Sequence, residues 1–348
     1  MSFSRIVIHI GLHKTATRFL QRAVFRQLDD EQFLVNPEPL FHDLRQAVRH
    51  PRDPDWAAAA KRAAEKVRQE AGGRTLVLSD PSISGDMYSS HVDYQANLDL
   101  VSHLFPDARI LYFVRRQSDW LQSAYRQSLV KGKGIPIERF LNFYDGDFRA
   151  RVGRRVYGAR TIEAMTLRFL EIYRAYAECF GAESVYLFRQ EDLRRSPDAV
   201  YARLAEALGI DVLPPAPARV SGNRAFSALA IHLFFRGVRS APAAPPASAA
   251  DTPADGSLPR LLSLGRQLRT NLIRHGFDRI VYRDWDLLES HGMRDRIESH
   301  YEREWARLTA VADELLQNGP GDHVLAHAAE RESATGNEVS SDRRMGGR

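Results

Sequence analysis

The stretch "IVIHIGLHKTATRFLQ", residues 6–21, joins a strand pattern, a short loop and a helix pattern. The β-branched run Ile6–Ile10 is typical of a strand that is buried on both faces. Gly11 permits a tight turn, and apolar residues then recur at helical spacing from Thr17 to Leu28. In a strand–loop–helix unit of this kind, the free N–H groups of the first helical turn and the positive end of the helix dipole both point at the loop. The stretch therefore predicts an α/β fold with an anion site at its first loop.

The rest of the chain alternates in the same way. Buried strands are predicted at Thr75–Ser79, Ala108–Arg116 and Ser184–Phe188, and helical patterns lie between them. These helical patterns cover Trp56–Ala71, Asn97–Phe105, Asp119–Val130, Thr161–Phe180 and the segment from Ser196 to Gly209. Strands separated by helices favour parallel pairing. We therefore expect a three-layer α/β/α domain with a central, mainly parallel sheet, a P-loop-like strand–loop–helix unit and additional C-terminal helices.

Composition divides the chain into four parts. Residues 1–240 form the expected α/β domain, and residues 241–257 are rich in Ala and Pro, which is typical of a flexible insertion. Helical patterns at Leu258–Ile273 and Met293–Leu316 predict a helical segment over residues 258–318 that packs on the same domain. The polar, Gly-containing residues 319–348 are expected to be a disordered tail.

Charge and cysteine content limit the class of protein. The 348 residues include 49 Lys and Arg against 44 Asp and Glu, a net charge of +5 that suits an anionic ligand without implying nucleic acid. The single cysteine, Cys179, is interpreted as a buried, inert thiol. No segment approaches the about 18 apolar residues that a membrane span requires. We expect a soluble enzyme of a bacterial cytoplasm, with its oligomeric state open.

The first loop carries groups that bind phosphate-like anions. Lys14 supplies a positive charge, and the hydroxyls of Thr15 and Thr17 can donate to phosphate oxygens. A nucleoside-triphosphate loop needs Gly before its lysine, whereas His13 occupies that position here. The dinucleotide fingerprint G-x-G-x-x-G is also absent at this strand. Kinase and GTPase chemistry is therefore disfavoured.

The loop resembles the 5′-phosphosulfate-binding loop of the sulfotransferases that use 3′-phosphoadenosine-5′-phosphosulfate (PAPS). Lys14, Thr15 and Thr17 match that pattern, whereas Ala16 replaces its usual Gly and Arg18 replaces its second Thr. We expect Ala16 to fit a helical turn but not a positive φ. The resemblance implies that the donor's 5′ end contacts His13, Lys14, Thr15, Ala16, Thr17 and Arg18.

A second stretch resembles the 3′-phosphate motif of the same family. In "ILYFVRRQSDWLQSAYRQ", residues 110–127, Arg115 ends the third strand, and Ser123 and Tyr125 follow on the next helix. An arginine at the carboxyl end of a strand lies in the crevice where open α/β sheets bind ligands, and its fork suits a phosphate. The resemblance assigns the 3′-phosphate to Arg115 and Ser123.

Sulfuryl transfer from PAPS to a hydroxyl or amine, by in-line displacement without a metal, is the activity that the resemblance implies. Lys14 would stabilise charge on the bridging oxygen. Asp80, at the end of the second strand, is the first candidate for a general base, with Asp86 and His91 behind it. Asp80 equally fits a cap of the turn at Pro81.

The acceptor is predicted only by class. Aromatic residues with Arg and Asp in segments 142–148 and 154–160 suit a carbohydrate or glycolipid, and equally suit a hydrophobic anchor of a loop. We expect no nucleic-acid partner. Two alternatives stay open: a P-loop-like kinase that acts on a small molecule with Mg²⁺, and a catalytically inactive relative that binds the nucleotide.

Overall fold

The computed structural model of the chain describes residues 2–130, 135–150, 155–156, 159–215, 286–289 and 292–318. These ranges cover most of the expected α/β domain and the last expected helix. The predictions for the insertion at residues 241–257, the helix at 258–273 and the tail at 319–348 lie outside the described residues.

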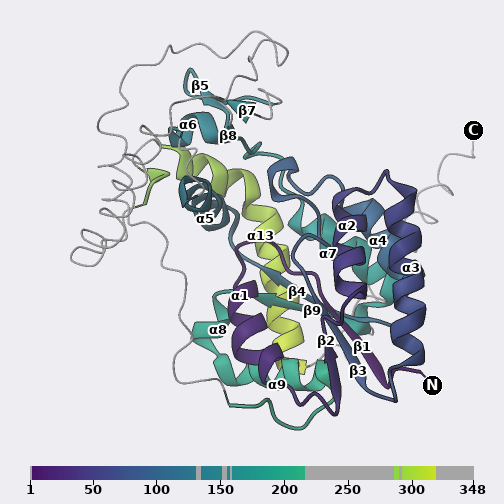
Figure 1. Cartoon of the computed structure of the whole chain (residues 1–348). Coiled ribbons are helices and arrows are strands. Elements are labelled where there is room, and N and C mark those ends of the chain that lie inside the picture. The colour runs from purple at the N-terminus through teal and green to yellow at the C-terminus, as the bar shows by residue number, and fades with distance from the viewer. Residues whose placement is uncertain are drawn as a thin grey trace, which may run out of the picture.

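A five-stranded parallel sheet forms the centre of the molecule, in the order β2-β3-β1-β4-β9 (Figure 1). Its strands are β1 (Arg5–His9), β2 (Phe33–Val35), β3 (Thr75–Ser79), β4 (Arg109–Val114) and β9 (Val185–Arg189). The chain after β1 first adds strands on one side and later, with β4, on the other. Parallel sheets bind ligands beyond the carboxyl ends of the two strands where the order reverses, which here are β1 and β4.

Helices cover both faces of the sheet, because alternate side chains of each buried strand point to opposite sides. Val7 packs in a cluster with Leu20 and Val200, whereas Ile8 packs with residues of the opposite helices. The first layer holds α1 (Thr17–Phe19), its continuation as a π turn (Leu20–Val24) and a 3₁₀ turn (Phe25–Gln27), and α9 (Pro197–Leu208). The second layer holds α2 (Leu40–Arg49), α3 (Pro54–Gln69), α4 (Tyr94–Leu104) and α7 (Phe169–Phe180). The expected three-layer α/β class is confirmed.

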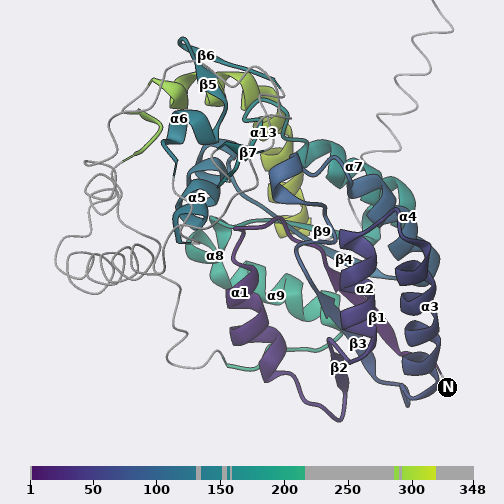
Figure 2. The same cartoon turned by 45° about the horizontal axis from the view of Figure 1, so that its top comes forward.

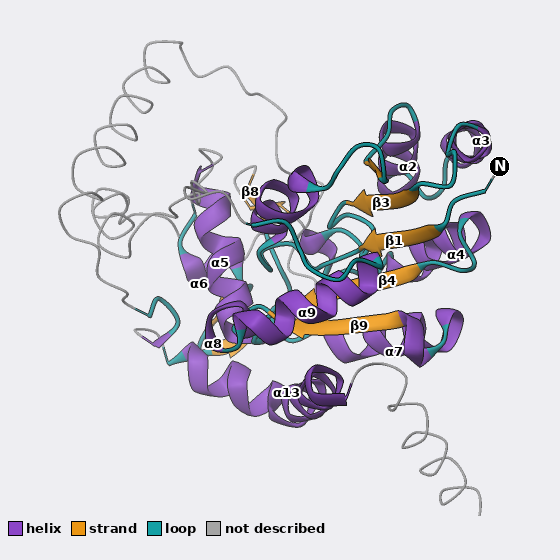
Figure 3. Cartoon of the chain, turned by 90° about the horizontal axis from the view of Figure 1, so that it is seen from below, coloured by secondary structure: helices purple, strands orange, loops and turns teal. Residues whose placement is uncertain are grey.

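The remaining elements gather beyond the carboxyl ends of the strands and along β9. They are α5 (Gln117–Val130), α6 (Ile137–Phe140), α8 (Asp192–Arg195), the 3₁₀ turns Met87–Ser89 and Ala182–Ser184, and two hairpins. The hairpins pair β5 (Phe143–Tyr144) with β6 (Asp147–Phe148) and β7 (Arg155–Val156) with β8 (Ala159–Arg160). The long helix α13 (Met293–Asn318) contacts β9 and α5, and it lies beyond β9 in the view along the sheet (Figures 2 and 3).

Three details differ from the sequence-based expectations. The structure adds β2 and α2, which were not predicted. The helix expected from Thr161 begins only at Phe169, because the preceding segment is held elsewhere; the Ile162 N–H, for example, donates to the carbonyl of Phe140. Cys179 is exposed rather than buried, since α7 turns its neighbours Tyr176 and Phe180 to the core. None of the helices in the described part of the chain combines the length and apolar character that crossing a bilayer requires.

Candidate anion-binding site

The loop between β1 and α1 has an unusual backbone conformation. Lys14 and Ala16, on either side of Thr15, have φ angles of 71° and 65°. The expectation that Ala16 avoids a positive φ is therefore wrong. Left-handed residues at alternate positions direct successive N–H groups toward one point, an arrangement that forms concave anion sites.

The backbone N–H groups of residues 14–18 have no acceptor among the described residues. Backbone hydrogen bonds link Ile10, Gly11 and Leu12 to β4, and helical pairing resumes with the Phe19 N–H, which donates to the Ala16 carbonyl at 2.8 Å. In the described part of the chain, the N–H groups of residues 14–18 between them donate to no protein group. Because N–H groups rarely remain without an acceptor, this row of donors is suited to an anionic ligand.

Several contacts fix the loop in this conformation. The Thr15 hydroxyl donates to the Leu12 carbonyl at 2.5 Å, and the Trp120 indole donates to the His13 carbonyl at 2.5 Å. Ser84 donates to the carbonyl of Gly11 at 2.9 Å. The Thr15 hydroxyl thus serves the loop itself, and Thr15 offers a ligand its N–H group instead. The loop is held in place before any ligand binds, which favours binding.

Glycine is required at position 11 for lack of space rather than for a tight turn. It does not adopt a positive φ; instead, a Cβ atom there would lie 2.5 Å from the Nε2 atom of His9. The His9 ring is fully buried, and its Nδ1 atom lies 2.8 Å from the Ser79 hydroxyl. Burial lowers the pKa of His9 to about 3, so the ring is neutral and acts as a packing element.

Lys14 is a half-buried cation in this loop. Burial, followed by repulsion from Arg18 and Arg115, lowers the pKa of Lys14 to about 8. Among the described residues no carboxylate pairs with Lys14, and the buried hydroxyl of Thr17 lacks a hydrogen-bond partner. The mutual repulsion places Lys14, Arg18 and Arg115 in one electrostatic neighbourhood.

Arg115 follows β4 directly and is also largely buried. Its pKa is lowered by burial, although the charges of Asp119 and Glu191 act in the opposite direction. Its Nε atom is buried without a hydrogen-bond partner. The guanidinium therefore retains hydrogen-bonding capacity that a phosphate can use.

Ser123 shares a face of α5 with two residues whose charges act on Arg115. Asp119 and Arg126 both act electrostatically on Arg115, and Ser123 lies between them on α5, four residues from one and three from the other. Ser123 is half-buried. Electrostatic interactions thus link Lys14 with Arg18 and Arg115, and Ser123 lies on α5 between two residues that act on Arg115. Arg126 was not predicted, although its spacing of three residues from Ser123 could have indicated it.

Both carboxylate oxygens of Asp80 are engaged by other groups. Its Oδ2 atom lies 3.0 Å from the Nε atom of Arg45 on α2, and its Oδ1 atom accepts a hydrogen bond from the Ser82 N–H at 2.7 Å. This is the alternative reading of Asp80 as a turn cap, completed by an ion pair. Asp86 is also engaged, because it pairs with Arg160 and accepts from the Tyr88 N–H.

The ring of His91 contacts the rings of His13, in the loop, and of Trp120, which donates a hydrogen bond to the loop. Its ring centroid is 6.2 Å from that of His13 and 5.6 Å from that of Trp120. The ring is fully buried, and neither nitrogen has a hydrogen-bond partner among the described residues. Burial, with a smaller effect of His13, lowers the pKa of His91 to about 3, so the ring is neutral and its surroundings oppose protonation.

Other features of the described residues lie apart from this region. No group of three or more His, Cys, Asp or Glu side chains is arranged there to hold a metal ion. A cavity of about 640 Å³ lies between α4, α7 and α13, and none of the predicted site residues line it.

The corner after β9 is structural, since Asp192 forms two hydrogen bonds with Arg189, at 2.8 and 2.9 Å.

Comparisons with known proteins include a structural likeness. No protein-family model matches the chain, and no curated protein matches it. The fold is similar to that of a sulfotransferase from Alicyclobacillus acidocaldarius, at a TM-score of 0.42 and 15% sequence identity over 79% of this chain and 96% of that chain. A likeness of this extent transfers no residue roles to the chain.

Proposed function

We propose that this protein is a PAPS-dependent sulfotransferase. The observation that carries the proposal is the row of N–H groups at residues 14–18, next to two half-buried cations, Lys14 and Arg115; none of these groups has a partner among the described residues. A ligand with two anionic ends fits two such positive regions. The residues present therefore fit a nucleotide that carries a phosphosulfate at one end and a phosphate at the other.

The proposed roles follow from the groups that each region offers. The N–H groups of residues 14–18 would hold the 5′ end, and Arg115 with Ser123 would hold the 3′-phosphate. When bound, the donor supplies the sulfuryl group that is transferred. Lys14 would stabilise the negative charge that develops on the departing phosphate, and removal of such a donor typically lowers the rate on the order of 10²–10³-fold. A bound anion also raises the pKa of Lys14, which keeps the ammonium group protonated at neutral pH.

His91 replaces Asp80 as the favoured proton acceptor. Both oxygens of Asp80 are engaged by Arg45 and by the turn, whereas both ring nitrogens of His91 lack partners. For His91 to take the proton of an acceptor hydroxyl, its pKa must rise from about 3, and the negative charge of a bound donor acts in that direction. We propose a carbohydrate or glycolipid acceptor by class only, and propose that no metal takes part.

The engagement of Asp80 also bears on the alternatives. A kinase would need a carboxylate near the loop to hold Mg²⁺, and Asp80, the candidate for that role, is paired with Arg45. A relative that binds the nucleotide without turnover would keep the anion site and lack a working base. The two alternatives therefore differ in whether His91 acts as a base.

Thermal melting with nucleotides tests the proposal. In EDTA, adenosine 3′,5′-bisphosphate is expected to raise the melting temperature, and the effect should be absent in Lys14→Ala and in Arg115→Ala. Asp192→Asn serves as a control outside the site. A larger rise with ATP and Mg²⁺ than with the bisphosphate would contradict the proposal. Transfer of labelled sulfate from PAPS to glycans, lost in His91→Phe, distinguishes an enzyme from a binding protein.

A further inference from the structure

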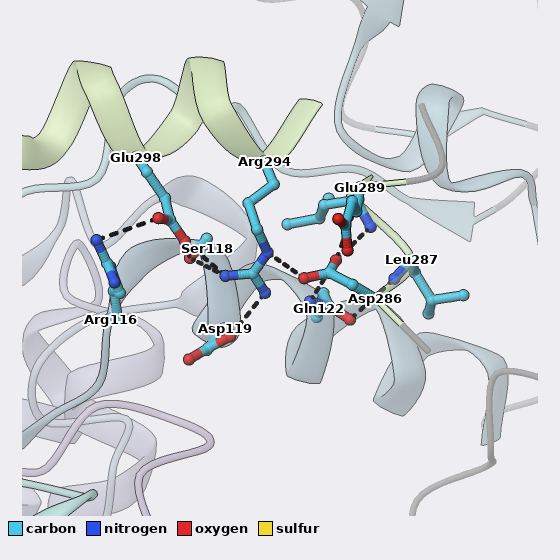
Figure 4. Close-up of polar contacts among 10 residues, drawn as sticks. Arg116, Ser118, Asp119, Gln122, Asp286, Leu287, Glu289, Arg294 and Glu298 are labelled. Carbon is cyan, nitrogen blue, oxygen red and sulfur yellow. Dashed lines mark hydrogen bonds and ion pairs between the residues drawn. The ribbon is translucent and has the colours of Figure 1, made fainter. Parts of the chain in front are cut away.

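A network of charged side chains joins the start of α13 to the start of α5 (Figure 4). It contains two arginines, Arg116 and Arg294, and three carboxylates, Asp119, Asp286 and Glu298. Arg116 lies 3.1 Å from Glu298, and Ser118 donates to the same carboxylate at 2.8 Å. The network thus begins at the residue that directly follows Arg115.

Arg294 is the centre of this network. Its guanidinium contacts Asp286, Glu298 at 2.5 Å and Asp119 at 2.9 Å, so that one side chain serves all three carboxylates. Burial opposes the charge of Arg294, but hydrogen bonds to Asp119 and Glu298 and the charge of Asp286 raise its pKa. A planar guanidinium can hold several carboxylates in fixed directions, which a lysine ammonium cannot do.

Asp119 is the member of the network that can interfere with the anion site. Its negative charge acts on Arg115, whose Nε atom has no partner. Asp119 lies in the first turn of α5, four residues after Arg115, and a carboxylate in such a position can pair with a guanidinium. In the structure the Asp119 Oδ1 atom instead accepts a hydrogen bond from the Nη2 atom of Arg294 (Figure 4).

We propose that Arg294 is a positioning residue that binds Asp119 and thereby keeps Arg115 available for the 3′-phosphate. This role rests on the proposed function. With Arg294 present, the network carries two positive and three negative charges; without it, a single arginine would face the same three carboxylates next to Arg115. Asp119 would then be released to pair with Arg115 and compete with the ligand.

Calorimetric titration with two nucleotides isolates this role. Adenosine 3′,5′-bisphosphate requires Arg115, whereas adenosine 5′-phosphate lacks the group that Arg115 would bind. Arg294→Met is expected to lower the affinity for the bisphosphate about tenfold or more, the size of one charge-assisted contact, and to leave the affinity for the monophosphate unchanged. The double variant Arg294→Met/Asp119→Asn should restore bisphosphate binding, because the competing charge is gone.

Two controls distinguish positioning from a general weakening of the fold. Asp313→Asn breaks the ion pair of α13 with Arg189, distant in sequence from Arg294, and should leave the affinities for both nucleotides unchanged. Asp119→Asn alone keeps Arg294 and should leave bisphosphate binding equal or tighter, which preserves the test if Arg294→Met does not fold. Arg294→Lys, which retains one charge, should fall between the wild-type chain and Arg294→Met.

The outcomes separate the role of Arg294 from the proposed function. An equal loss for both nucleotides in Arg294→Met, or no recovery in the double variant, would overturn the role of Arg294 alone. A loss of bisphosphate affinity in Asp119→Asn would do the same. If the wild-type chain does not prefer the bisphosphate over the monophosphate, the proposed function fails, and the role of Arg294 fails with it.

Discussion

The unpaired charge of Lys14 predicts that the anion site destabilises the protein when no ligand is bound. The pKa of Lys14 falls from 10.5 to about 8, and burial is the largest cause. Each pKa unit corresponds to about 1.4 kcal/mol, so the charged lysine lowers the free energy of unfolding by up to about 3 kcal/mol. Lys14→Met removes the charge and keeps a side chain of similar length. We therefore expect this variant to be more stable than the wild-type chain at pH 7.

The effect has a defined dependence on pH. Below pH 8 the lysine is protonated in both the folded and the unfolded chain, and the folded state bears the whole penalty. Between pH 8 and 10.5 the folded chain loses the proton first, so the free energy of unfolding of the wild-type chain rises with pH. The difference between Lys14→Met and wild type should therefore be about 3 kcal/mol at pH 7 and should shrink toward pH 10.5.

Urea denaturation of both proteins at a series of pH values measures this difference, and melting temperatures give a second reading. At roughly 2 °C per kcal/mol for a chain of this size, the variant should melt about 6 °C higher at pH 7. The bisphosphate should stabilise the wild-type chain and not the variant. A variant that is less stable than wild type at pH 7, or a difference that stays constant from pH 7 to 10, would refute the reasoning.

Three further substitutions test single features of the loop and its surroundings. Ala16→Gly relieves a φ of 65° and should raise the free energy of unfolding by up to about 1 kcal/mol in urea denaturation; a decrease would contradict a left-handed Ala16. Asp80→Asn weakens the contact with Arg45 and should lower the free energy of unfolding by about 1–2 kcal/mol, while titration shows unchanged bisphosphate affinity; a large loss of affinity would return Asp80 to the site. The pKa of His91 is about 3 in the folded chain and 6.5 in the unfolded chain, so protonation of the unfolded chain lowers the free energy of unfolding as the pH falls from 6.5 to 3. His91→Phe should lose less stability than the wild-type chain over this range in an acid titration. Equal losses would show that His91 is already charged in the folded chain.

Much of the fold was predictable because β1, β3, β4 and β9 are uninterrupted apolar runs separated by helical patterns. The strand β2 escaped prediction because it has three residues and pairs only with β3 at one edge of the sheet. The helix α7 starts late because the preceding segment forms a hydrogen bond with α6, and the periodicity of apolar residues gives no sign of such a contact.

The site was predictable where it depends on topology. The carboxyl ends of adjacent parallel strands meet, which is why Lys14 and Arg115 could be expected in one region. The cap that Asp80 forms was one of its two predicted readings, whereas the φ angle of Ala16 and the pairing of Asp80 with Arg45 were not predicted. A backbone angle at Ala16 and a partner for Asp80 from α2 are set by tertiary packing, and no local pattern encodes either of them.

The position of α13 has a consequence for the order in which the protein matures on the ribosome. The strands and α5 are all complete by residue 189, whereas Arg294 follows more than a hundred residues later. At about 10 residues per second, translation of that interval takes on the order of 10 s, during which Asp119 has no arginine from α13 to bind. During synthesis, the contact between Asp119 and Arg294 thus forms only after α13 has been made, well after the central sheet is complete.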